Sequence, residues 1–254
     1  MNKHLSVFKL LARSTILKIL GILAVMVAAE VLLFTRQAEK MAGYAGGFFL
    51  EDIFGESFFF VCLFVAYFTV GSVLCRTGSR PESMQTYTLQ RLAISEYAIM
   101  AWQSLWNLIC FLLLWAVQLW TVYLLLQNFL AKHPDAGFTQ HHIFLAFWRH
   151  DTLHALLPME DILSWIKIVI TVLTLSVTTA YGAYVTRKTG KGSAICNVML
   201  IEAYALFNIR GVSGLIYTSI IIIFLLVLMF SMLRNKYELE PDESGEEEEP
   251  WAES

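Results

Sequence analysis

The sequence predicts an all-α, polytopic membrane protein with six transmembrane helices. Of its 254 residues, 57% are apolar and only 15% are charged, whereas soluble domains contain about 45–50% apolar and about 25% charged residues. The apolar residues are also gathered into long runs without period-2 alternation. Such runs are helices in lipid, because a helix satisfies its own backbone hydrogen bonds.

The six predicted spans are separated by polar segments. Most are close to the roughly 20 residues that a helix needs to cross the hydrocarbon core, although the third is longer and the fifth is shorter. The spans cover residues 16–34, 58–74, 97–126, 162–184, 193–207 and 212–233. With their connections they form one transmembrane domain over residues 16–237.

Residues 1–15 are expected to form an interfacial helix in the cytoplasmic headgroup layer. Apolar residues recur there at helical spacing among basic ones, a pattern typical of a helix lying on a membrane surface. The apolar residues are Leu5, Phe8 and Leu11, and the basic ones are Lys3, Lys9 and Arg13. A plain positively charged flank to the first span is the alternative.

Both chain ends are predicted to be cytoplasmic. If the N-terminus lies inside, 12 of the 18 Lys and Arg residues fall on the inner side, as the positive-inside rule requires. An even number of spans then returns the C-terminus to the same side. Residues 238–254 hold nine acidic residues and no basic one, so we expect a disordered acidic tail there.

The composition argues against two classes of soluble function. A formal net charge of -3 does not fit a globally basic nucleic-acid-binding protein, and six spans leave no room for a large catalytic domain. The chain also lacks a P-loop, because Gly190-Lys191 is followed by Gly192 rather than by Ser or Thr. We therefore expect neither an enzyme nor a cofactor in this chain.

No metal site is predicted, although His150 and His154 are candidate ligands. They lie four residues apart, so they would share one face of a helix. The aromatic and apolar residues at 143–148 favour an interfacial helix on the outer leaflet instead. The four cysteines show no CxxC spacing and are expected to be structural thiols.

Polar side chains within the spans are the candidates for a transport pathway, because they are costly in lipid unless they are paired or face a wet cavity. One helix face of the third span carries Gln103, Asn107, Gln118 and Thr121, and one face of the fourth carries Thr171, Thr174, Thr178 and Tyr181. Glu202 lies deep in the fifth span, whereas Glu30 is expected to reach the outer headgroups. Both hydrogen bonding between helices and a substrate-facing wall remain open interpretations.

The longest inner loop, residues 75–96, alternates polar and apolar side chains as a short helix lying against a partner would. The alternating residues include Arg80, Pro81, Glu82, Met84, Tyr87, Leu89, Arg91 and Leu92. The loop ends in Leu92-Ala93-Ile94-Ser95-Glu96, where the third span begins.

On this loop and on its span count, the chain resembles the permease subunits of type 2 ABC (ATP-binding cassette) exporters. Those subunits have an interfacial N-terminal helix and a coupling helix that leads into a Leu-Pro-aliphatic-Ser-Arg motif, where this chain has Ala93 and Glu96 in place of Pro and Arg. The resemblance implies that the loop presses into a separate ABC ATPase subunit. The implied coupling residues are Arg80, Pro81, Glu82, Met84, Tyr87, Leu89, Arg91, Leu92 and Ser95, with a smaller second contact from Arg187, Lys188 and Lys191.

The resemblance further implies the membrane subunit of an exporter in the bacterial cytoplasmic membrane. Two permease chains, identical or paralogous, would form the pathway, and the partner ATPase would hold ATP and Mg²⁺. The expected pathway residues are Gln103, Asn107, Gln118, Thr121 and Glu202. Amphipathic peptides, antibiotics or lipids would suit a bundle so rich in aromatic residues. The alternative is a non-transporting scaffold or sensor that works through its His-rich outer loop and acidic tail.

Overall fold

The computed structural model contains helices and no strand among the residues that it describes. These are residues 3–42, 49–55, 58–77, 95–134, 137–159 and 162–189, with Ile220, Ile223 and Val227 beyond them. The four long helices are α1 (Lys3–Ala42), α2 (Phe58–Cys75), α4 (Glu96–Lys132) and α7 (Ile162–Thr189). The short ones are η1 (Leu50–Phe54), α5 (Gln140–Arg149) and α6 (Asp151–Leu156). The predicted all-α class is confirmed.

Three of these helices, α1, α4 and α7, are long and apolar enough to cross a membrane, and α2 is a shorter apolar helix. All four lie where spans were predicted, which supports a membrane protein. The predicted spans at 193–207 and 212–233 lie outside the described residues, apart from the three single residues named above. The acidic tail at 238–254 also lies outside them. The total of six spans therefore stays a prediction.

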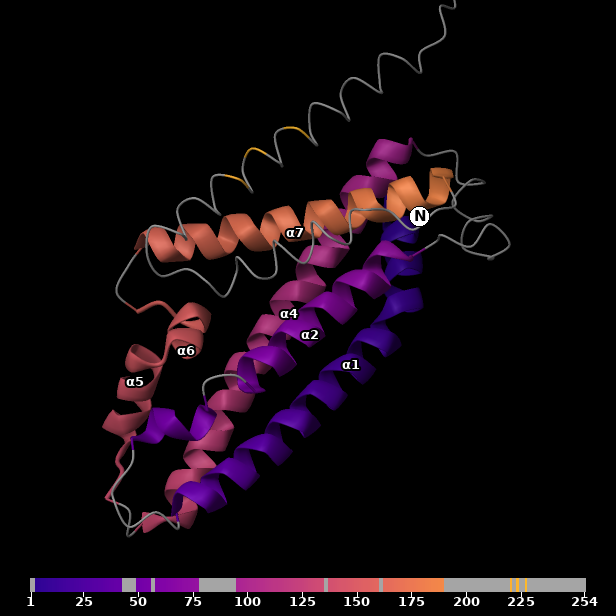
Figure 1. Ribbon diagram of the computed structural model, residues 1–254. Coiled ribbons are helices and arrows are strands. Elements are labelled where there is room, and N and C mark those ends of the chain that lie inside the picture. Colours follow the sequence, from indigo (N-terminus) through magenta and orange to yellow (C-terminus); the bar gives the residue numbers. More distant parts are fainter. Residues whose placement is uncertain are drawn as a thin grey trace, which may run out of the picture.

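The bundle of long helices has two ends, which are occupied by different parts of the chain. Figure 1 shows the first residues of α1 beside the last residues of α7, at what we call the N-terminal end. The short helices η1, α5 and α6 lie at the opposite end and are called the cap. The loop at 78–94, which was predicted to couple to an ATPase, lies outside the described residues but leaves α2 and enters α4.

The interfacial helix expected at residues 1–15 is part of a longer helix in the structure. Residues 3–15 continue without a break into the first span, so that α1 has 40 residues and a length of about 60 Å. No Gly or Pro stands before Gly21 to stop the helix. The ring of Phe8 also packs edge-on against Trp102 and Trp106 of α4, with centroids 6.0 and 5.5 Å apart. This contact holds the N-terminal turns against the bundle.

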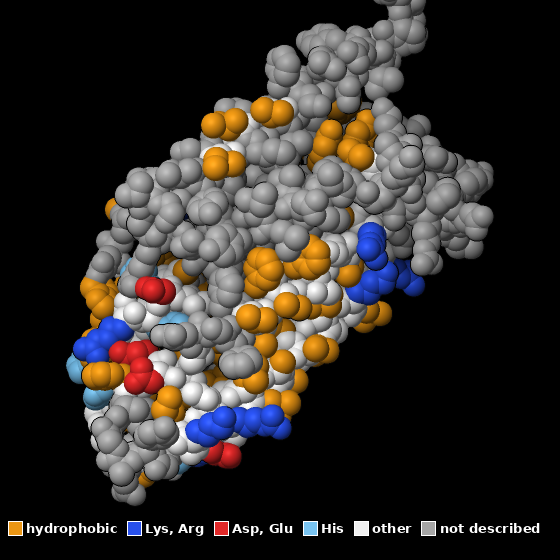
Figure 2. Space-filling model, in the orientation of Figure 1, with side chains coloured by type: hydrophobic (Ala, Val, Ile, Leu, Met, Phe, Trp, Pro, Cys, Tyr) orange, Lys and Arg blue, Asp and Glu red, His pale blue; other side chains and the backbone are white. Residues whose placement is uncertain are grey.

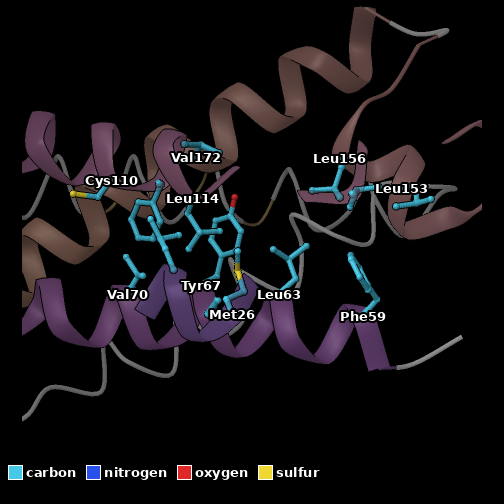
Figure 3. Close-up of a cluster of buried hydrophobic side chains, with 14 of the residues drawn as sticks. Met26, Phe59, Leu63, Tyr67, Val70, Cys110, Leu114, Leu153, Leu156 and Val172 are labelled. Carbon is cyan, nitrogen blue, oxygen red and sulfur yellow. The ribbon is translucent and has the colours of Figure 1, made fainter. Parts of the chain in front are cut away.

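The core lies where α4 meets the other long helices. The most extensive contacts of α4 are with α7 and α1, and α2 packs against both α1 and α7. Figure 3 shows side chains from α1, α2, α4 and α7 pointing toward one another, among them Met26, Leu63 and Leu114. The ring of Tyr67 on α2 stacks on Phe111 of α4 with centroids 5.9 Å apart. Apolar and aromatic packing therefore fixes the centre of the bundle.

Apolar side chains also cover the outside of the bundle. Leu17, Val25 and Ile162 are 78%, 71% and 79% exposed, and Figure 2 shows hydrophobic side chains over much of the described surface between groups of charged ones. Exposed apolar area of this extent is abnormal for a soluble monomer. It is the expected surface of helices that contact lipid.

The cap is held together by aromatic packing and one ion pair. Phe54 of η1 packs against Phe34 of α1 and Phe59 of α2, with centroids 5.4 and 5.1 Å apart. Arg149 of α5 lies 3.4 Å from a Glu51 carboxylate oxygen, and its guanidinium sits 5.2 Å from the centre of the Phe49 ring. The helix predicted at 143–148 is present as α5, which packs against η1 and α6.

Truncation of the central leucine of α4 tests the core. Leu114 is fully buried, whereas its neighbour Leu113 is 37% exposed. Leu114→Ala should lower the free energy of unfolding by about 2–5 kcal/mol, because it leaves a cavity that the bundle cannot close. Leu113→Ala, the matched control, should change it by less than about 1 kcal/mol. Unfolding in mixed micelles, followed by circular dichroism, measures both, and equal losses would contradict this core.

Candidate functional site

The polar stripe predicted on the third span faces the inside of the bundle. Gln103, Asn107, Gln118 and Thr121 of α4 are all buried, with exposed fractions between 0 and 6%. Burial of polar side chains is costly unless each one finds a partner. The partners of these side chains therefore distinguish hydrogen bonding between helices from a substrate-facing wall. Glu202, the fifth predicted pathway residue, lies outside the described residues.

Asn107 joins α4 to α7. Its amide lies 2.8 Å from the Thr179 hydroxyl whichever way the amide is turned. With Nδ2 toward α7, it donates to Thr179 Oγ1 and, at 3.4 Å, to the Ser176 carbonyl. With Oδ1 toward α7, Nδ2 donates to the Gln103 carbonyl at 3.1 Å. The Cys75 thiol of α2 donates to the Thr179 carbonyl at 3.5 Å, so three helices meet at this point.

The polar stripe predicted on the fourth span, which is α7 in the structure, does not by itself make the contact to α4. Thr171 and Thr174 are buried, but their hydroxyls donate to Lys167 and Ile170 carbonyls of their own helix, at 2.8 Å each. Thr179, which lay outside the predicted stripe, makes the contact to α4 instead. The sequence signal for it is the cluster of small and hydroxyl residues Ser176, Thr178, Thr179 and Ala180, because such residues let two helices approach closely.

A second polar link joins α4 to α1. The indole N–H of Trp106 donates to Thr15 Oγ1 at 2.8 Å, and the Thr15 hydroxyl donates to the Leu11 carbonyl at 3.0 Å. Both side chains are buried. A buried indole usually finds an acceptor, but the sequence does not tell which helix supplies it. The link lies one residue from Asn107, so α4 is tied to α1 and α7 at the same level.

Arg187 ties the end of α7 to the beginning of α4. Its Nη1 donates to Gln103 Oε1 at 2.9 Å, and its Nη2 lies 3.9 Å from a carboxylate oxygen of Glu96. Its side chain is only 10% exposed. Arg187 was predicted to belong to a second ATPase contact, and in the structure its guanidinium lies between α4 and α7. The Lys188 side chain and Lys191 lie outside the described residues.

Glu96 joins the first turn of α4 to α7. Its acidic side chain pairs with Arg187, with 3.9 Å between a carboxylate oxygen and Nη2. Ser95, the last of the predicted coupling residues and the only described one, caps α4 by accepting a hydrogen bond from the Ala98 N–H at 3.4 Å. The start of α4 is thus fixed by a cap and by an ion pair.

Glu30 is placed differently from the prediction. It is fully buried within the bundle instead of reaching the headgroups, and it lies near Gln118 of α4 and Cys62 of α2. Within the described residues, neither the Glu30 carboxylate nor the Gln118 amide makes a hydrogen bond of ordinary geometry. A buried acid and amide inside a membrane bundle are costly unless they are paired, so Glu30 and Gln118 are candidates for a functional position.

Comparison with known protein families, with curated proteins and with solved structures finds no match to this chain.

The histidines of the cap pack against aromatic rings. His150, between α5 and α6, lies 6.0 Å from Phe54, and His154 lies 6.3 Å from Trp148, measured between ring centroids. Across the described ranges, no group of three or more His, Cys, Asp and Glu side chains is arranged to hold a metal ion. Ring packing is thus one contact of each candidate ligand in the structure.

A double-mutant cycle tests the link between α4 and α7. Asn107→Leu and Thr179→Val each remove one partner, and the coupling energy between them should be about 0.6–1.7 kcal/mol, the range found for hydrogen bonds between membrane helices. Thr171→Val is the matched control, because that hydroxyl bonds its own helix. It should show no coupling to Asn107→Leu. Unfolding free energies in mixed micelles measure the cycle, and equal coupling for both pairs would rule out the specific contact.

Proposed function

We propose that this chain is the membrane-spanning subunit of an ATP-driven ABC exporter of the bacterial cytoplasmic membrane. Two such chains, identical or paralogous, form the pathway, and a separate ATPase that binds ATP and Mg²⁺ drives it. Both termini lie in the cytoplasm in this proposal. The substrate class that fits the aromatic-rich spans is an amphipathic peptide, an antibiotic or a lipid.

The continuity of α4 is the observation that carries the proposal. This helix begins at Glu96, directly after the loop proposed to couple to the ATPase, and continues for 37 residues to Lys132. A helix of that length spans about 55 Å. Alternating access needs a stiff element that transmits closure of the ATPase to the bundle, and a long helix rooted at the coupling loop supplies one.

The links near the start of α4 add a second support. Arg187, Thr15 and Thr179 all bind α4 within residues 96–107. A force on the beginning of α4 therefore acts on α1 and α7 as well. In this proposal Gln103 and Asn107 serve as links between helices, and Gln118 with Glu30 is left to face the substrate pathway.

Substitution of three loop residues tests the coupling. Arg80, Tyr87 and Leu89 changed together to Ala remove a charge and two apolar contacts from the proposed coupling helix. The amount of ATPase that copurifies with the full-length chain from native membranes should fall at least about tenfold, which corresponds to about 1.4 kcal/mol of binding free energy. Unchanged ATPase association and activity would show that this loop does not couple to an ATPase.

Deletion of residues 238–254 is the control and separates the two functional hypotheses. Without the acidic tail, an exporter should still bind its ATPase and should still transport its substrate or protect the cell against it. A scaffold or sensor that works through the tail should lose its partners on this deletion while keeping its fold. Loss of partners with the tail, together with an absence of any copurifying ATPase, would favour the scaffold.

A further inference from the structure

An open groove of about 560 Å³ runs between α1 and α2 on the outside of the bundle. Its walls are apolar apart from one charged residue, Lys18. The lining residues are Lys18, Gly21, Ile22, Val25, Met26, Ala29, Val61, Cys62, Val65, Ala66 and Thr69. The Thr69 hydroxyl donates to the Val65 carbonyl of its own helix at 2.7 Å, so its polar group is already satisfied. The groove thus offers an apolar channel with a cation on its wall.

Small residues give the groove its depth. Gly21 and Ala29 lie on the α1 wall, and Ala66 lies on the α2 wall. A Cβ atom added at Gly21 would meet nothing within 4 Å. A larger side chain at this position would therefore enter the groove without displacing any described part of the protein.

The length of the groove along α1 matches one leaflet of a bilayer. From Lys18 to Ala29 the axis of α1 rises about 16 Å, which is about half of the roughly 30 Å hydrocarbon core. Lys18 and Arg36, both exposed, are about 27 Å apart along α1. Between them the only charged residue is Glu30, which is buried. Lys18 therefore stands at the headgroup boundary of one leaflet.

Lys18 is also available to an anion. Among the described residues no carboxylate forms an ion pair with it, and the exposed residues Lys9 and Arg13 continue the positive charge of α1 beyond it. Basic residues at the membrane surface attract anionic lipid headgroups. The charge at this end of the groove is complementary to a phosphate.

We propose that this groove binds one acyl chain of an anionic phospholipid in the leaflet on the Lys18 side, with the lipid phosphate at Lys18. A helix of a second copy would need to follow the whole apolar length of α1, whereas the groove is limited to about half of it. The site does not depend on the exporter function, because it uses only the outer surfaces of α1 and α2.

Lipid retention by the full-length protein tests the site. The protein is purified in micelles that contain phosphatidylglycerol and phosphatidylcholine, and native mass spectrometry counts the bound lipids. One phosphatidylglycerol should stay bound. Lys18→Gln should weaken its retention about fivefold, while the matched control Arg36→Gln, an exposed residue of the same helix that lies outside the groove, should not. Gly21→Leu should remove the bound lipid altogether by filling the groove.

A second groove-filling variant and the mass of the assembly complete the test. Ala29→Leu fills the other end of the groove and replaces Gly21→Leu if that variant does not fold, as judged by circular dichroism. The same spectra report the mass of the assembly. Retention that is equal in all variants would overturn the proposal, and so would a change in oligomeric mass on filling the groove with no change in bound lipid. The second result would assign the groove to another copy of the chain.

Discussion

A polar group buried inside a membrane bundle must find its partner within the protein, because lipid offers none. In the described part of this protein, α4 meets that constraint. Its buried side chains bond to Thr15 of α1 and to Thr179 and Arg187 of α7. Apolar packing surrounds these links, but it would allow helices to slide or rotate. The polar links fix the register of α4 against its neighbours, and the remaining structure is arranged around that register.

The position of the links has a mechanical consequence. They are concentrated in the first turns of α4, near the loop that the exporter hypothesis couples to an ATPase. Toward the cap, the polar groups on α4 and α1 are Gln118 and Glu30, which are buried without a hydrogen bond to each other of ordinary geometry. α4 is also tied to the cap, because the Trp115 indole N–H donates to the Leu156 carbonyl of α6 at 3.1 Å. In the proposed exporter, a movement of the first turns of α4 would act on α1 and α7 through the three links near its start.

The sequence predicted the helices well and their partners poorly, for a physical reason. Apolar runs bounded by charged residues located α2, α4 and α7 within a few residues, and helical periodicity found the buried face of α4. An amphipathic pattern does not tell whether residues 3–15 bend away from the first span, and in the structure they continue without a break into the rest of α1. The burial of Glu30 and the choice of Thr179 as a partner depend on how each helix is rotated about its axis. That rotation is set by tertiary packing, which a single sequence does not display.

The claim that α4 transmits ATPase closure is tested most directly by a distance measurement on the purified complex. A spin label at Ala101, an exposed residue near the start of α4, would report the separation of the two chains in the proposed dimer. The account predicts that this separation changes when ATP is trapped in the partner ATPase, while a label pair between Ala101 and the exposed Val169 of α7 keeps its distance. An unchanged separation between the two chains, or a change between α4 and α7 within one chain, would contradict it.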